Sequence, residues 1–396
     1  MKEGYKESAL GLIPKSWAVT NIGDVATKVQ DGNYGASYPK SNEFLAEGVP
    51  FLTSSTISSN IVNFDKLKYI SEIKHIELKK AHIKENDVIL TNRGANIGKC
   101  AITTPSLEDA NIGPQVTLIR CKKDYDYNLL HQVIMSSIIQ KQIANINSGS
   151  AMNFLSLKVT NALQIPFPPL PEQQKIAEIL STVDAKIEII DQQISETQEL
   201  KKGLMQQLLT KGIGHTDFKD SALGEIPKSW EVVKIGDVMK LGGGKDYKHL
   251  NEGNFPVYGT GGIMTYVDEY LYEGESVGIG RKGTIDKPVF LKGKFWTVDT
   301  LFYTHSFTNV IPFFVYVVFQ SINWRKYSEA TGVPSLSRRI IEPIEIPLPS
   351  IEEQSKIVDV FQSVWGKLEV LSEKKATYQE LKQGLMQQLL TGKVRV

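Results

Sequence analysis

The chain contains the same opening segment twice. Residues 8–25, SALGLIPKSWAVTNIGDV, return as residues 221–238, SALGEIPKSWEVVKIGDV, with 14 of 18 positions identical. A closing segment is repeated as well, because QELKKGLMQQLLT at 198–210 and QELKQGLMQQLLT at 379–391 differ at one position. An internal repeat of this kind constrains a fold more than any local pattern does. The sequence therefore predicts two halves built on one frame.

The segments between the constant ends differ in length and in sequence. The opening copies are 213 residues apart, whereas the closing copies, with their entries IPFPPLPEQQKI (165–176) and IPLPSIEEQSKI (346–357), are 181 apart. The first half is thus 32 residues longer. The alternative is an old duplication followed by neutral drift, which has no reason to spare only the ends. We expect one scaffold that presents two different recognition surfaces, with Trp17 and Trp230 of the openings as core residues.

Each closing segment has the apolar spacing of a coiled-coil helix. Residues 176–208 and 357–389 place seam positions alternately four and three residues apart over five heptads. Gly212 and Gly392 follow the last turns, where a C-terminal cap belongs. Each helix is expected to span about 39 residues, or about 58 Å at 1.5 Å per residue. The predicted seam contains Ile176, Leu180, Val183, Ile187, Ile190, Ile194, Ile357, Phe361, Val364, Leu368 and Leu371.

The order of the segments predicts that the two helices pair antiparallel. The first helix leads through 211–220 straight into the second opening, so the second helix has to run back in order to pair with it. The chain's start, 5–11, matches 218–224, which places the chain's end near its beginning. The predicted fold class is α+β, with two mixed β-rich domains separated by a long antiparallel two-helix coiled coil and a pseudo-twofold internal repeat. The predicted boundaries are 1–164 and 213–345 for the domains and 165–212 and 346–396 for the helical regions.

Composition indicates a globular protein without bulk positive charge. Hydrophobic residues make up 41% of the chain, charged residues 22%, and the net charge is +1. A protein that binds DNA through bulk electrostatics is usually more basic. The N-terminus has no apolar run, no apolar stretch is long enough to span a bilayer, and two cysteines, Cys100 and Cys121, give no disulfide framework. We expect a cytoplasmic protein with no membrane partner.

Catalytic and metal-binding motifs are not found in the sequence. The six histidines are dispersed without metal-ligand spacing, and no G-x-S-x-G elbow occurs. The segment GANIGKC (94–100) is one residue short of a phosphate loop, with Cys100 where a hydroxyl is needed. There is no Asn-Pro-Pro-aromatic tetrapeptide of the kind that amino-methyltransferases use. We therefore expect no catalytic residue, no metal site and no cofactor bound by this chain.

Polar turns at matching places in the two inserts contain the candidate DNA-contacting residues. In 87–103 and 276–291 an apolar strand is followed by Arg-Gly or Arg-Lys-Gly, a polar turn and another strand. Residues 276–294 contain five basic side chains and one acidic one, a local concentration of positive charge. Such side chains contact phosphates and base edges. Together with the loops before the closing entries, the predicted DNA-binding residues are Arg93, Asn96, Lys99, Asn153, Arg281, Lys282, Thr284, Arg338 and Arg339.

The order of these motifs resembles the specificity subunit of type I restriction-modification enzymes. The opening L-G-x-I-P-x-x-W, the variable β-rich region, the entry I-P-x-P-x-x-x-E-Q-x-x-I, the heptad helix and the ending L-M-Q-Q-L-L-T-G-K occur in that order, and nearly the whole chain is covered in duplicate. The resemblance implies two target recognition domains, each recognising one half of a bipartite asymmetric site in double-stranded DNA. It also implies that the helices set the distance between the half-sites and bind two modification subunits.

The resemblance places the chemistry in other chains. The modification (methyltransferase) subunits would bring S-adenosylmethionine and methylate a flipped-out adenine. Restriction subunits, which are nuclease-translocases that use ATP and Mg²⁺, would cut unmodified DNA. This chain would then be a non-catalytic subunit.

Two alternatives remain open from the sequence. The chain could be a coiled-coil adaptor with two β-rich domains that bind proteins or other ligands, which a net charge near zero would suit. A neighbouring methyltransferase gene, or copurification with a methyltransferase, would discriminate against it. The chain could also be a catalytic DNA methyltransferase, which the missing motifs disfavour.

Overall fold

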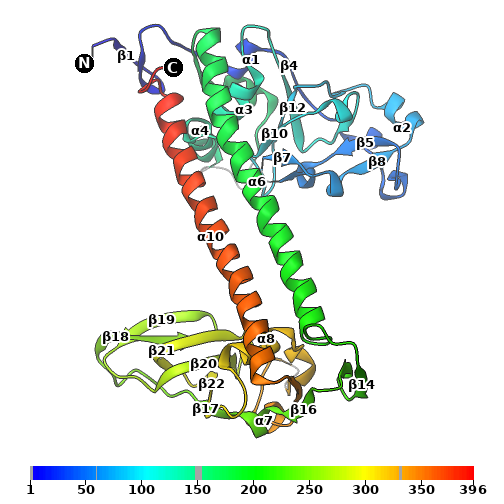
Figure 1. Ribbon diagram of the computed structural model, residues 1–396. Coiled ribbons are helices and arrows are strands. Elements are labelled where there is room, and N and C mark those ends of the chain that lie inside the picture. The colour runs from blue at the N-terminus through cyan, green and yellow to red at the C-terminus, as the bar shows by residue number, and fades with distance from the viewer. Residues whose placement is uncertain (1–2, 59, 148–153, 330–331) are drawn as a thin grey trace. The chain divides into compact units, whose positions relative to one another are not determined.

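The computed structural model describes residues 3–58, 60–147, 154–329 and 332–396. The chain divides into two compact units, Met1–Ile189 with Lys375–Val396, and Ile190–Lys374. Two long helices, α6 (Leu170–Leu208) and α10 (Ile351–Leu389), are drawn in green and in orange to red in Figure 1. Each has 39 residues, which confirms the helices expected from the heptads. Both are cut by the division, so each unit contains a β-rich domain and part of each helix.

The first unit is built on short strands that form several small sheets. The opening forms the hairpin β1 (Tyr5–Ser8) and β2 (Gly11–Pro14), and β3 (Ala18–Asn21) pairs antiparallel with β13 (Gln164–Phe167) of the closing entry. An antiparallel sheet follows, in the order β10 (Cys100–Ile102), β9 (Val88–Thr91), β12 (Val116–Cys121) and β4 (Ala26–Asp31). A second sheet contains β11 (Asn111–Ile112), β5 (Val49–Leu52) and β8 (Lys68–Ile70), and β6 (Ile57–Ser58) pairs with β7 (Ile61–Val62).

Short helices connect the strands of the first unit. The α-helices are α1 (Ile22–Val25), α2 (Glu72–Glu77), α3 (Tyr127–Met135), α4 (Ser137–Asn147) and α5 (Leu157–Ala162). The 3₁₀ turns are η1 (Gly35–Ser37), η2 (Ser41–Glu43), η3 (Ser54–Thr56), η4 (Phe64–Lys66) and η5 (Pro105–Leu107).

The second unit repeats the frame around a larger sheet. The hairpin β14 (Phe218–Ser221) and β15 (Gly224–Pro227) leads to β16 (Glu231–Lys234), which pairs with β23 (Glu345–Leu348). The sheet order is β17 (Lys240–Gly243), β22 (Leu301–His305), β20 (Tyr272–Gly280), β21 (Val289–Thr297), β18 (Glu252–Gly259) and β19 (Gly262–Val267). The helices are α7 (Ile235–Val238), α8 (Pro312–Ser321), η6 (Trp324–Tyr327) and α9 (Arg338–Ile341).

Three strands of each sheet correspond one to one. Asp31 of β4 lies opposite Thr117 of β12, which lies opposite Leu90 of β9. In the second unit, Gly243 of β17 lies opposite Phe302 of β22, which lies opposite Ile279 of β20. Strands β4, β12 and β9 therefore match β17, β22 and β20 residue by residue. This register fixes which side chains of the two inserts occupy the same place.

The constant motifs are explained by buried hydrogen bonds. Trp17 Nε1 donates to Glu172 Oε2 at 2.8 Å, and Trp230 Nε1 donates to Glu353 Oε2 at 2.8 Å. Both indoles are buried, as expected for core residues. The glutamine that follows each glutamate is also buried and bonded to backbone: Gln173 Nε2 to Pro168 O, and Gln354 Nε2 to Pro349 O, each at 2.9 Å. The repeated tryptophan of the opening and the Glu-Gln pair of the closing entry thus join the two ends of each variable insert.

The chain's end occupies in the first unit the place that the linker occupies in the second. Arg395 donates to Glu172 through Nε and, at 2.8 Å, through Nη2. In the second unit, His215 Nε2 lies 2.8 Å from Glu353 Oε1, and the amide of Ile213 also donates to this oxygen. The expected proximity of the chain's start and end is confirmed by Tyr5, whose hydroxyl donates to the carbonyl of Gly392 at 2.9 Å.

Within each unit, the start of one long helix lies beside the end of the other. In the first unit, Ile176 and Leu180 share a core with Leu389, and Lys382 Nζ pairs with Asp184 Oδ1 at 2.6 Å. In the second unit, Leu208 shares a core with Ile357 and Phe361. Most side chains of the predicted seam are buried, and three are partly buried, namely Ile187, Ile194 and Leu368. The buried seam residues are Ile176, Leu180, Val183, Ile190, Ile357, Phe361, Val364 and Leu371.

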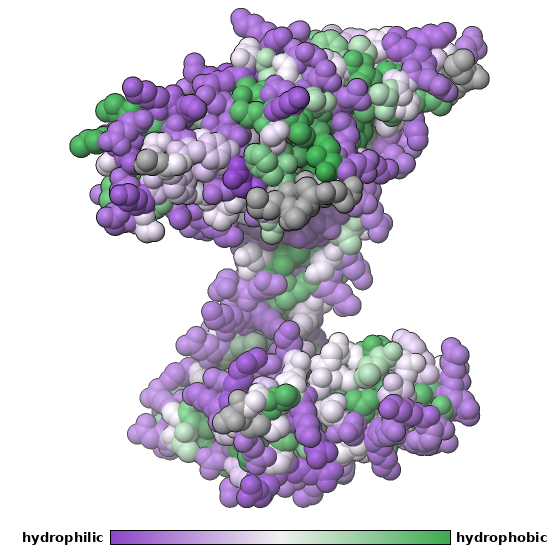
Figure 2. Space-filling model, turned by 180° about the vertical axis from the view of Figure 1, so that it is seen from behind, coloured by the Kyte–Doolittle hydropathy of each residue, from purple (hydrophilic) through white to green (hydrophobic). Residues whose placement is uncertain are grey.

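Hydrophilic residues predominate on the face that Figure 2 shows, where hydrophobic residues form small groups. Across the described ranges, none of the helices combines the length and apolarity needed to cross a bilayer.

Alanine at two glycines of α10 and its cap is expected to change stability in opposite directions. Gly392 has φ +66°, and a Cβ there would lie 2.4 Å from Pro14 Cγ, so Gly392→Ala should lower the free energy of unfolding of the first unit by about 1–2 kcal/mol. Gly384 lies inside the helix with open space around a Cβ, so Gly384→Ala should raise it by about 1 kcal/mol. Urea midpoints of the two variants check this. An unchanged midpoint for Gly392→Ala would contradict the cap, and a lower midpoint for Gly384→Ala would contradict the open space at that position.

Candidate nucleic-acid interface

In the first unit, the turn after β9 lies against the segment that precedes α5. The amide of Leu155 donates to the carbonyl of Asn92 at 2.8 Å, and Arg93 forms an isolated β-bridge with Phe154. The amide of Asn92 donates to Gln115 O at 2.9 Å. Gly94 continues the turn with φ +82°, a conformation that glycine adopts without strain. The two loops singled out in the sequence are therefore neighbours in space.

The second unit holds the equivalent turn in the same way. The amide of Leu336 donates to Arg281 O at 2.9 Å, the amide of Arg281 donates to Thr300 O at 2.7 Å, and Lys282 bridges to Ser335. Gly283 has φ +85°. These contacts make the loose match between the two turns specific: Arg93 is equivalent to Lys282, and Arg281 is equivalent to Asn92.

A buried polar network supports the turn of the first unit. Asn92 is fully buried, and its Nδ2 donates to Asp31 Oδ1 and to Thr117 Oγ1, each at 3.0 Å. Thr117 Oγ1 also donates to Asp31. Tyr34 directs its hydroxyl inward and donates to Asp31 Oδ2 at 2.8 Å. Partial burial and the bond to Asp31 raise the pKa of Tyr34 to about 12, so the hydroxyl remains a donor at neutral pH.

The predicted residues of this turn line the edge of the network. Arg93 Nη2 donates to the Tyr34 hydroxyl at 2.9 Å, and its guanidinium lies 4.5 Å from the centre of the Phe154 ring. Asn96 Nδ2 donates to Ser54 O at 3.2 Å, and Lys99 Nζ donates to Asn96 Oδ1 at 2.9 Å. Arg93, Asn96 and Lys99 thus belong to one turn. Asn153 lies outside the described residues.

Two arginines replace the polar network in the second unit. Gly243 stands where the first unit has Asp31, and Phe302 stands where it has Thr117. The guanidinium groups of Arg281 and Arg338 lie 6.0 and 5.8 Å from the centre of the Phe302 ring. Both arginines are exposed. A guanidinium near an aromatic face is held by cation–π attraction while its five donors stay free for a ligand.

Positive charge gathers on this edge of the second sheet. Partial burial, together with Arg338 and Lys240 nearby, lowers the pKa of His305, so the imidazole is neutral at pH 7. Lys282 and Thr284 share the turn of Arg281. Arg339 is paired with Glu329 and not with the Phe302 ring, since its Nη2 lies 3.4 Å from Glu329 Oε1.

Sequence reasoning missed five residues that support these turns: Asp31 on β4, Tyr34 after β4, Asn92 after β9, Thr117 on β12 and Phe302 on β22. They lie far apart in the chain. The one available signal was that Asn92 and Arg281 each end an apolar strand before a glycine turn.

Comparison with known proteins identifies the family to which the two repeated halves belong. The model of the type I restriction modification DNA specificity domain matches residues 14–199 and 227–382, once in each half. The chain is 30% identical over 437 residues to a protein of Methanocaldococcus jannaschii named for the MjaX type I restriction enzyme specificity subunit, with 100% of this chain and 97% of that protein covered. The MjaVIII specificity subunit of the same organism is 26% identical with the same coverage.

Solved structures support the fold. The S subunit of a type I restriction-modification system from M. genitalium superposes with a TM-score of 0.65 at 17% identity, covering 94% of this chain and 96% of that one. A second structure, from work on assembly of the type I system, gives a TM-score of 0.56 at 17% identity and covers 96% and 99%. The doubled domain match and the full-length relatives agree with the repeat, and the chain belongs to the family of type I restriction-modification specificity subunits.

Proposed function

We propose that the chain selects the DNA sequence on which a type I restriction-modification complex acts, and that each β-rich domain recognises one half of a bipartite asymmetric site in double-stranded DNA. The observation that supports this most is that the turn after β9 and the turn after β20 share one backbone arrangement but have different side chains. The Asp31, Asn92 and Thr117 positions of the first domain become Gly243, Arg281 and Phe302 in the second. A shared frame with unlike contacts is what recognition of two unlike half-sites requires.

We further propose that α6 and α10 pair antiparallel along their length and set the distance between the half-sites. Asp184 pairs with Lys382, and Lys201 Nζ lies 4.3 Å from the centre of the Trp365 ring. From Asp184 to Lys201 the chain advances 17 residues, and from Lys382 to Trp365 it goes back 17 residues, which is the equal spacing that one antiparallel register would require. A helix of about 58 Å corresponds to about 17 base pairs, so domains at its ends could contact successive major grooves.

The partners follow from the family. In this proposal two modification subunits bind the complex and use S-adenosylmethionine to methylate adenine, and restriction subunits use ATP and Mg²⁺ to cut unmodified DNA. This chain contributes DNA contacts and no catalytic residue. The two free cysteines, Cys100 and Cys121, suit a reducing cytoplasm. No observation favours the alternative of a coiled-coil adaptor for proteins or other ligands.

Lengthening both helices by one heptad is expected to lengthen the gap between the half-sites. Duplication of residues 186–192 in α6 and of the equivalent residues 367–373 in α10 keeps the seam in phase and adds about 10.5 Å, or about three base pairs. Sequencing of modified adenines in cells that express the variant with its modification subunit measures the gap. The half-site sequences should stay the same, because neither domain is changed.

A substitution without insertion is the matched control. Gln192→Ala with Glu373→Ala alters the same region of the two helices and should leave the gap as it is. Changed half-site sequences with an unchanged gap, in the insertion variant, would show that the helices do not set the distance.

A further inference from the structure

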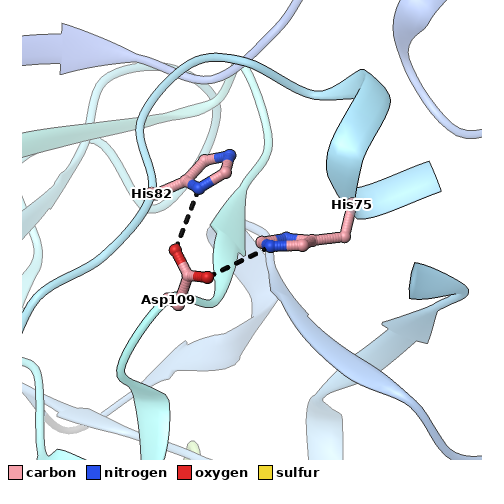
Figure 3. Close-up of side chains that lie close together, drawn as sticks. All are labelled: His75, His82 and Asp109. Atoms are coloured by element: carbon pink, nitrogen blue, oxygen red, sulfur yellow. Dashed lines mark hydrogen bonds and ion pairs between the residues drawn. The ribbon is translucent and has the colours of Figure 1, made fainter. Parts of the chain in front are cut away.

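Three side chains of the first unit converge away from the turn of Asn92. His75 is on α2, His82 follows α2 by five residues, and Asp109 precedes β11. Figure 3 shows the Asp109 carboxylate between the two imidazole rings. The candidate ligand atoms all lie within 4.8 Å of one another. Among the described residues, this is the one group of three His, Cys, Asp or Glu side chains with such geometry.

The bonds of His82 leave a lone pair directed at a carboxylate. Its Nε2 lies 2.5 Å from the carbonyl oxygen of Leu78, and a carbonyl only accepts, so this nitrogen carries the hydrogen. Its Nδ1 lies 2.9 Å from Asp109 Oδ1. A neutral imidazole with hydrogen on Nε2 would present an unshared pair on Nδ1 to a negative oxygen, which is repulsive. A cation between the two atoms removes the repulsion.

His75, like His82, has one ring nitrogen facing a neutral oxygen and the other facing Asp109. Its Nδ1 lies 2.7 Å from Asn111 Oδ1, and its Nε2 lies 3.2 Å from Asp109 Oδ2. One nitrogen of each ring thus faces a neutral oxygen, and the other faces the shared carboxylate. Histidines that bind a metal through one nitrogen almost always donate the other N–H to a carbonyl, carboxylate or water, which fixes the tautomer and the ring.

The backbone around the three side chains is strained and tightly held. Ala81 and Asp109 have φ of +55° and +62°, in the left-handed region that alanine rarely adopts. The amide of Asp109 donates to Ile83 O at 2.8 Å, and the amide of Ile83 donates to Ala110 O at 2.9 Å. Strained residues of this kind persist where their surroundings determine them, and they cluster at ligand sites.

We propose that His75 Nε2, His82 Nδ1 and an oxygen of Asp109 bind one divalent metal ion of the zinc type. Two imidazoles and one carboxylate suit Zn²⁺ or Co²⁺, whereas Mg²⁺ and Ca²⁺ prefer oxygen ligands alone. Tetrahedral ligands at about 2.0–2.2 Å from the ion lie about 3.3 Å apart, so a small movement of the rings completes the site. The Asp109 side chain is 66% exposed, which leaves room for entry of the ion and for water as a fourth ligand.

The ion would hold α2 to the sheet that contains β11. Helix α2 has six residues, and Ile73 and Ile76 on it are 74% and 71% exposed, so burial of these two side chains contributes nothing to its attachment. His75 faces inward instead and is buried. Metal coordination would tie α2 and the turn at His82 to the loop of Asp109, as it does in small domains with few apolar contacts.

Metal uptake by the full chain tests the site. Chain freed of metal by chelator and dialysis is titrated with Co²⁺, and with Zn²⁺ in competition, and the bound metal is counted by elemental analysis. We expect one ion per chain and the intense visible absorption of tetrahedral Co²⁺. His82→Ala and Asp109→Asn should each weaken Co²⁺ binding at least 100-fold. Asparagine tolerates the positive φ at 109, so the second variant keeps the backbone.

His305→Ala is the matched control, because His305 is a partly buried histidine of the other unit. Its Co²⁺ affinity should equal that of the unaltered chain. Absence of uptake by the unaltered chain would overturn the proposal and would leave protons as the cations between the rings and Asp109. Unchanged uptake by both His82→Ala and Asp109→Asn would overturn it as well, since the ion would then be bound elsewhere.

Discussion

Replacement of Arg281 and Arg338 together by alanine should abolish specific recognition of one half-site and leave the other intact. Both guanidinium groups are exposed beside the Phe302 ring, where their donors are free to bond to a base edge. A bidentate arginine–guanine pair contributes about 1–3 kcal/mol of discrimination. Loss of both should weaken specific binding by the assembled methyltransferase about 100-fold or more. Binding to duplexes altered in one half-site at a time measures the effect.

The single variants distinguish base contacts from phosphate contacts. An arginine that contacts a base relaxes specificity at one position when removed, whereas an arginine that contacts phosphate weakens binding to all sequences and reduces the salt dependence. Arg325→Ala is the matched control, since Arg325 is an exposed arginine of the same domain that is paired with Asp286. Unchanged specific binding by the double variant would exclude this edge of the second sheet as a contact with bases.

The frame was predictable because its signals are local or repeated. The heptads of α6 and α10 need only the chain's own order to be recognised, and Gly212 and Gly392 end both helices with φ near +65°. The proximity of the chain's start and end followed from the match of residues 5–11 with residues 218–224. These features rest on backbone periodicity and on burial of apolar side chains, which a sequence shows directly.

The sites were less predictable because they depend on register between distant strands. The sequence pairs Arg-Gly in one turn with Arg-Lys-Gly in the other without fixing the residue-by-residue match, and only the strand pairing shows that Asn92 occupies the place of Arg281. Asp31 and Asn92 are 61 residues apart, and His75 and Asp109 are 34 apart. No spacing rule joins such residues, so the sequence predicted neither the buried network nor the histidine pair.

Asp31→Ala should destabilise the first unit by about 3–5 kcal/mol and leave the second unchanged. The substitution removes the acceptor of three side chains, and Asn92 and Thr117 are fully buried. A buried donor left without its partner costs about 1–3 kcal/mol. Amide hydrogen exchange, followed separately in β9 of the first unit and in β20 of the second, measures the change in each. Specific binding to the first half-site should weaken as well, because Asn92 begins the turn that contains the predicted DNA contacts Arg93, Asn96 and Lys99.

The coupling between Asp31 and Asn92 decides whether the network acts as one unit. If Asp31 holds Asn92, then Asn92→Ala should cost less in the Asp31→Ala background than in the unaltered chain, by about 1 kcal/mol or more. Glu47→Ala, at an exposed carboxylate of the same domain, should cost little. Strictly additive effects would mean that the two side chains stabilise the turn independently. The second domain has Gly243 and Arg281 at these positions and cannot form the network. Additive effects would mean that this difference does not explain why the two domains recognise different half-sites.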